Sequence, residues 1–95
     1  MIDEAAFYGC TGLTDITIPD SIMYIGTMAF KECNNLTSLT LPDGIVYVSS
    51  SAFDGCDNLT VTYKGQEYDA SNFDALFEQF DRDDMWAYHY GVYGG

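Results

Sequence analysis

One apolar pattern recurs along the chain at a fixed period, which is the distance in sequence from Phe7 to Phe30 and again from Phe30 to Phe53. When the sequence is compared with itself at this spacing, identical residue types coincide at several positions. The coinciding sets are Ala6, Ala29 and Ala52; Phe7, Phe30 and Phe53; Cys10, Cys33 and Cys56; and Leu13, Leu36 and Leu59. Because so many positions agree at one period, we interpret the chain as a repeat protein, in which each unit packs against the next.

The repeat unit combines a short strand with a longer arc. Ile16 and Ile18 alternate with a period of two, which predicts a strand, and Pro19 ends it because proline cannot donate to a ladder. The apolar residues that follow, from Ile22 to Cys33, are mostly three or four apart, which indicates an irregular or helical arc. We expect the strands of successive units to pair in parallel at about 4.8 Å, burying one continuous core.

The most specific part of the repeat is Ala-Phe-x-x-Cys-x-x-Leu, present at residues 6–13, 29–36 and 52–59. Over residues 2–63 the chain resembles the BspA-like, or Treponema pallidum-type, leucine-rich repeats. The resemblance implies an α/β repeat fold: a right-handed leucine-rich-repeat solenoid with short parallel strands and a C-terminal hairpin-plus-helix cap. The third copy departs from the pattern, because Val61 and Tyr63 follow Leu59, and we therefore expect the last strand to be shifted by one residue.

The C-terminal third is predicted to form the cap. Residues 59–68 read as a hairpin that turns at Lys64-Gly65, where the glycine supplies a positive φ. Ser71 is a candidate N-cap of a helix over residues 72–80. Four residues at positions i, i+3, i+4 and i+7 form one apolar stripe on that helix: Phe73, Leu76, Phe77 and Phe80. We therefore divide the chain into repeats at 1–63, with the first repeat truncated, and a cap with an aromatic tail at 64–95.

The aromatic tail, residues 81–95, has two interpretations. Trp86, Tyr88 and Tyr90 alternate with other residues, as in a strand. These rings either fold over the edge of the core or form an exposed strand. Asp81, Asp83 and Asp84 leave weak calcium binding open, although no EF-hand fits, because the residue eleven positions after Asp81 is Val92.

Charge excludes some classes of partner. The chain has fifteen acids and three bases, for a net charge of −12. Nucleic-acid binding requires clustered cations, and an anionic membrane surface would repel this chain. No apolar run reaches the roughly 18 residues of a membrane span. The acidic surface serves either solubility alone or a cationic partner.

The sequence predicts no catalytic centre, metal site or cofactor. The three cysteines are separated by one full repeat each, unlike the close pairs of zinc sites, and are expected to be small buried hydrophobes. His89 is the only histidine, and no nucleophile and acid converge on it. The glycines are isolated at turns and make no phosphate-binding loop. We therefore expect that the protein is not an enzyme.

A polar surface remains as the candidate site. On leucine-rich repeats the strand residues between core positions face the concave side. Here they are Asp15, Thr17, Ser38, Thr40, Thr60 and Thr62. This ladder suits contact with a protein or a glycan, and it is equally what a solvated parallel sheet presents.

The resemblance implies a non-catalytic interaction or adhesion module of a bacterial surface or secreted protein, with a host matrix protein as one partner. The alternative is a structural role, in which the segment caps a longer solenoid or self-associates. Residues 1–17 hold only half a unit, which leaves Ile2, Phe7 and Leu13 without a covering repeat. We expect a homodimer through that truncated N-terminal end. Met1 is followed by no signal peptide, so the chain reads as a fragment.

Overall fold

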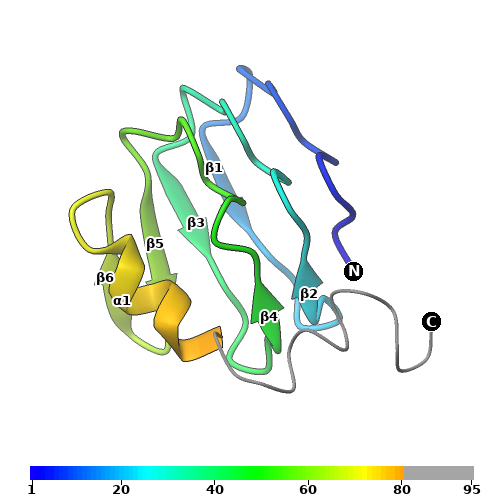
Figure 1. The fold of residues 1–95 in the computed structure, drawn as a ribbon, viewed down its shortest axis with the longest axis vertical. Helices are drawn as coiled ribbons and strands as arrows, with labels where there is room; N and C mark the ends of the chain where they lie inside the picture. The colour runs from blue at the N-terminus through cyan, green and yellow to red at the C-terminus, as the bar shows by residue number, and fades with distance from the viewer. Residues whose placement is uncertain (81–95) are drawn as a thin grey trace.

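A computed structural model describes residues 1–80, which wind into three stacked coils covered at one end by a helix (Figure 1). We call residues 1–18 coil one, 19–41 coil two and 42–63 coil three. The elements are β1 (Asp15–Thr17), β2 (Tyr24–Ile25), β3 (Ser38–Thr40), β4 (Tyr47–Val48), β5 (Thr60–Tyr63), β6 (Gln66–Tyr68), α1 (Phe73–Phe77) and a 3₁₀ helix at Glu78–Phe80.

The main sheet has the strand order β1-β3-β5-β6. The first three strands are parallel, as predicted, and each comes from a different coil. Ile16 pairs with Leu39, which is one full period along the chain, whereas Leu39 pairs with Val61, which lies one position short of a full period. The predicted one-residue shift of the last strand is therefore confirmed.

A second, smaller ladder runs along the arcs. β2 and β4 are parallel, and an isolated parallel bridge joins Ile2 to Ile25, so this ladder also includes all three coils. Figure 1 shows β2 and β4 beside each other, apart from the main sheet. Ile25 and Val48 are buried at 0% and 2% exposure, which adds a second wall to the core.

The arcs are irregular, and the helical alternative is wrong for the coils. Within residues 1–72 the structure has no helix; its regular elements there are all strands. All three coils have a left-handed residue at one equivalent position, Gly9 (φ 69°), Glu32 (φ 59°) and Gly55 (φ 81°), and coils one and two have a second at Ala5 (φ 56°) and Met28 (φ 58°). A left-handed φ interrupts a right-handed helix, so apolar residues three or four apart here mark turns rather than helical faces. The fold is a repeat, with its helix confined to the cap, and its winding hand stays a prediction.

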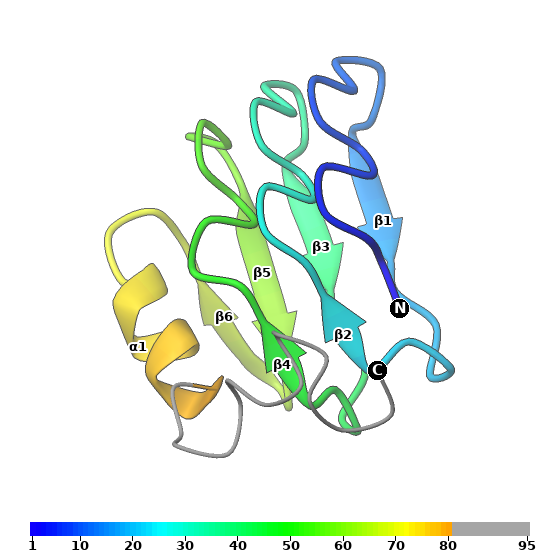
Figure 2. The same cartoon turned by 45° about the vertical axis from the view of Figure 1, so that its right-hand side comes forward.

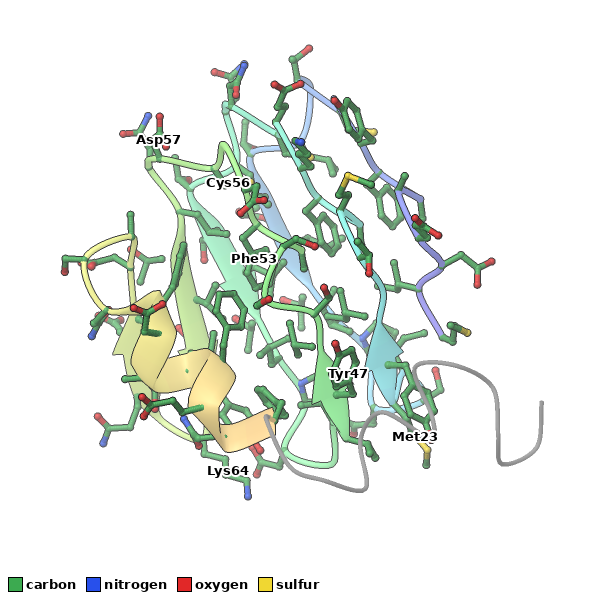
Figure 3. All side chains as sticks on the ribbon, in the orientation of Figure 1. Met23, Tyr47, Phe53, Cys56, Asp57 and Lys64 are labelled. Atoms are coloured by element: carbon green, nitrogen blue, oxygen red, sulfur yellow. The ribbon has the colours of Figure 1, made fainter. Side chains whose placement is uncertain are left out.

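Aromatic rings run through the core from coil to coil. Phe7 stacks on Phe30 with ring centroids 5.1 Å apart, and Phe30 stacks on Phe53 at 6.0 Å. Phe77 of α1 continues the row, with its ring centroid 6.0 Å from that of Phe53, which is labelled in Figure 3. The cap helix therefore covers coil three by supplying the ring that a further coil would supply.

The cysteines form a second line inside the coils. Cys33 and Cys56 are buried, Cys10 in coil one is half-buried, and all three are free thiols. The expected thiol core is therefore present, except that Cys10 is less covered because it belongs to an end coil. Burial raises the pKa of the Cys33 thiol, and it raises the pKa of the Cys56 thiol to about 11.

The cap follows the predicted hairpin. β5 and β6 are antiparallel with Tyr63 opposite Gln66, and the two residues between them, Lys64 and Gly65, have φ of 52° and 78°. Two successive positive φ values are the requirement of a type I′ turn, which matches the twist of a hairpin.

The predicted N-cap is wrong. The N-cap residue of α1 is Asn72, and no side chain caps its N-terminus. Ser71 donates its hydroxyl to Asp69 Oδ1 instead, and Asn72 Oδ1 accepts from the Asp69 amide at 2.7 Å. These polar groups form hydrogen bonds within the loop that precedes α1, so they do not cap the N-terminus of the helix. Residues 81–95, with the aromatic tail, His89 and the acids at 81–84, lie outside the described residues.

Candidate binding surface

The six strand residues singled out in the sequence lie in two rows across the main sheet. One row pairs Asp15 with Ser38 and Ser38 with Thr60; the other pairs Thr17 with Thr40 and Thr40 with Thr62. Between the rows Leu39 and Val61 are fully buried, so the alternation predicted from the pattern separates inside from outside. We call these six residues the strand face.

Exposure on the strand face falls from coil one to coil three. Asp15, Thr17 and Ser38 are exposed, whereas the residues further along the two rows are half-buried: Thr40, Thr60 and Thr62. The face is therefore accessible across all three coils and most open over β1. Its groups are hydroxyls and one carboxylate, which donate and accept hydrogen bonds but make weak nucleophiles without an activating base.

Side-chain hydrogen bonds between coils hold the rows in register. Thr37 donates its hydroxyl to the Thr14 carbonyl oxygen at 3.0 Å, and Asn35 donates its amide to the Thr11 carbonyl oxygen at 2.7 Å. Both lie just before the strands and link coil two to coil one. These two bonds tie the segments that precede β1 and β3 to each other.

The hairpin extends the strand face beyond the repeats. Glu67 of β6 pairs with Thr62, which adds an exposed carboxylate to the second row. The repeat pattern did not reveal it, because β6 is antiparallel and lies outside the repeat period. The hairpin predicted over residues 59–68 already places a strand there, but Glu67 is not among the candidate site residues predicted from the sequence.

The described residues do not form a metal centre. In the part of the chain that the structure describes, no three His, Cys, Asp or Glu side chains are grouped so as to hold a metal ion. The thiols of Cys33 and Cys56 instead donate to the carbonyl oxygens of Phe7 and Phe30, each at 3.0 Å. Among the described residues, no helix is long and apolar enough to cross a membrane.

Comparison with protein families decides the class of the repeat. The family described as "BspA type Leucine rich repeat region (6 copies)" matches residues 1–77. The chain belongs to the BspA-type leucine-rich-repeat family. The match spans the coils, the hairpin and α1. Comparisons with curated proteins and with solved structures gave no match. Leucine-rich repeats of this type are in general non-catalytic modules for protein interaction, built as extended binding surfaces.

Proposed function

We propose that this BspA-type segment is a non-catalytic adhesion module that contacts its partner, a protein or a glycan, through the strand face. The observation that carries the proposal is the pair of polar rows, which are in register across three coils on one sheet. A flat surface of regularly spaced hydroxyls contacts an extended partner at many points, each of them weak.

The proposed setting is the surface or the exterior of a bacterium, with a host matrix protein as the partner. Membership of the BspA-type family supports this setting. The acidic composition, fifteen acids against three bases, also supports a partner that is neutral or cationic on the contacting side. Nucleic acid is excluded from the proposal for the same electrostatic reason.

Binding to immobilised matrix proteins tests this function. Ser38, at the centre of the first row and exposed, is changed to Arg, and the matched control is Asn34→Arg, an exposed polar residue in the turn before β3. We expect Ser38→Arg to weaken binding at least tenfold and Asn34→Arg to leave it within twofold. Equal effects of the two variants would show that the strand face is not the contact.

Self-association is a second candidate function, and one observation favours it. Ile2, Phe7 and Leu13 of coil one are half-buried, whereas their equivalents in coil two, Ile25, Phe30 and Leu36, are fully buried. The exposed edge of β1 and this apolar surface suit a second copy of the chain.

Two further features of the proposal concern organisation. We propose that residues 1–63 are the interaction unit and that residues 64–95 are a cap with an appended tail. We also propose a right-handed winding, in keeping with the handedness of parallel strand connections.

A further inference from the structure

A hollow of about 460 Å³ lies where β1 and β3 end, between two equivalent turns of neighbouring coils. The turns contain Pro19-Asp20 and Pro42-Asp43, which occupy the same position in successive repeats. Thr17 and Thr40 line the hollow on the strand side, and Asp20 and Asp43 line it on the turn side. Figure 2 shows both turns at the same end of the main sheet. The hollow thus opens at the end of the Thr17 row of the strand face.

The walls of the hollow are of two kinds. Leu41 and Pro42 are buried residues whose edges line it, and they offer apolar surface. Asp20 and Asp43 are exposed, and among the described residues neither carboxylate has a hydrogen-bond or ion-pair partner. Asp20 and Asp43 belong to equivalent turns of neighbouring coils and both line the hollow, so its turn side carries two negative charges. A positive charge placed in the hollow would be attracted by both.

The described bases of the protein are engaged elsewhere. Lys64 follows β5, and its Nζ lies 5.4 Å from the centroid of the Tyr63 ring (Figure 3). Lys31 is placed over the Tyr8 ring, with its Nζ 5.9 Å from the ring centroid. Neither lysine lines the hollow. Within residues 1–80, the charge that would balance Asp20 and Asp43 is therefore not supplied by the chain itself.

We propose that the hollow receives a basic side chain, Lys or Arg, of the protein partner. The aliphatic stem packs against Leu41 and Pro42, as stems of basic residues do on apolar surface, and the cationic head lies between the two carboxylates. The hydroxyls of Thr17 and Thr40 accept further N–H groups of a guanidinium. The inference rests on the proposed function for one point only, that the occupant belongs to a protein.

A metal ion fits the hollow less well than a basic side chain. Calcium takes six to eight oxygen ligands and favours several carboxylates. The hollow has two carboxylates, and the described residues contain no group of three metal-ligating side chains. A guanidinium, by contrast, needs only two carboxylates and a few hydroxyl acceptors around a planar fork.

Titration with a small probe tests the hollow directly. Backbone amide shifts of the isotope-labelled chain are followed by NMR during addition of Nα-acetyl-arginine methylamide at constant ionic strength. The uncharged citrulline analogue is the control for shape. We expect the arginine probe to shift the amides of Thr17, Asp43 and Gly44 at least threefold more than the citrulline probe does. In Asp20→Asn/Asp43→Asn the shifts should fall at least threefold, and in Asp54→Asn/Asp57→Asn, which removes two exposed charges elsewhere, they should not.

Three outcomes would overturn the proposal: equal shifts with citrulline, equal losses in the two double variants, or larger shifts of the same amides with calcium chloride. Because the readout needs no natural partner, it can succeed or fail independently of matrix binding by the Ser38→Arg variant. Amide dispersion in the same spectra reports whether each variant is folded.

Discussion

The Sγ atom of Cys56 donates a hydrogen bond to the carbonyl oxygen of Phe30, 3.0 Å away in the preceding coil. The same contact joins Cys33 to Phe7 one coil earlier, also at 3.0 Å. Each of these thiols is therefore a buried link between neighbouring coils. Cys10 occupies the equivalent position in coil one and is only half-buried.

Thiol labelling should separate the three cysteines. The thiolate is the reactive form, and burial raises the pKa values of Cys33 and Cys56, so both should react slowly in the folded protein. We expect Cys10 to be modified first by a maleimide at neutral pH, and all three to react once the chain is denatured. Mass spectrometry of the labelled peptides gives the order. Rapid labelling of Cys56 under native conditions would contradict the buried link.

Stability should fall in alkaline solution because of Cys56. Desolvation is the main cause that raises the pKa of this thiol from 9.0 to about 11 in the folded protein. The unfolded chain therefore loses the proton at lower pH. The stabilisation is intact below about pH 9 and is lost as the pH rises through about 11, and the loss reaches about 2 kcal/mol near pH 10.5. Urea unfolding at several pH values checks this, with Cys56→Ala as the control that removes the share of the pH dependence that comes from this thiol.

Truncating the aromatic row should be costly. Phe30 is fully buried between Phe7 and Phe53, so Phe30→Ala should lower the free energy of unfolding by about 3–5 kcal/mol. Thr40 lies on the strand face and is half-buried, so Thr40→Ala should cost well under about 1 kcal/mol. Urea denaturation followed by circular dichroism measures both. A larger loss for Thr40→Ala would reverse the assignment of inside and outside.

The left-handed turns predict opposite outcomes for two glycines. Gly55 has φ of 81°, and a Cβ there would lie 3.1 Å from Glu32 Cγ and 3.2 Å from Glu32 Cα. Gly55→Ala should therefore destabilise by about 1–2 kcal/mol. Gly12 has ordinary φ and open space around it, so Gly12→Ala should be neutral or stabilise by up to about 1 kcal/mol. Thermal unfolding of the pair compares them, and similar melting temperatures would argue against the strained geometry at Gly55.

The residues that point inward could be predicted from the sequence, because one fixed period repeats Phe, Cys and Leu at the same depth. The second ladder could not. Ile22 and Ile25 are three apart, which fits a helix and a turn equally. The left-handed φ of Glu32 has no sign in the glutamate itself, and only the glycines at the equivalent positions 9 and 55 hint at it. Ser71 and Asn72 are both good N-cap residues, and only the loop contacts of Asp69 decide between them.

Part of the candidate site could likewise be predicted from the sequence, and part could not. The two rows of the strand face follow from alternation within each strand, and they lie in register as pattern and period together imply. Glu67 depends on the pairing of a hairpin that lies outside the repeat. The hollow depends on how two Pro-Asp turns stand beside the ends of β1 and β3, which no spacing in the sequence encodes.

Self-association should proceed through coil one. Its apolar residues Ile2 and Phe7 are half-buried, and β1 is the edge strand of the main sheet. The other end of that sheet is occupied by β6, and α1 covers the rings of coil three, so two coil-one ends are expected to meet in a closed two-fold dimer. We expect light scattering to show a dimer at high protein concentration.

The negative charge of the chain should oppose formation of this dimer, and added acidic residues at the contact should weaken it further. Asp3, Glu4 and Asp15 are exposed on coil one, and the whole chain carries −12, so added salt should strengthen the association by screening repulsion. Ile2→Asp/Phe7→Asp should weaken the dimer, with circular dichroism reporting that the variant is folded. The aromatic segment at residues 86–95 is the alternative contact for a dimer, and its deletion should leave the dimer intact. A monomer at every concentration, or a dimer lost only on that deletion, would show that coil one is not the contact.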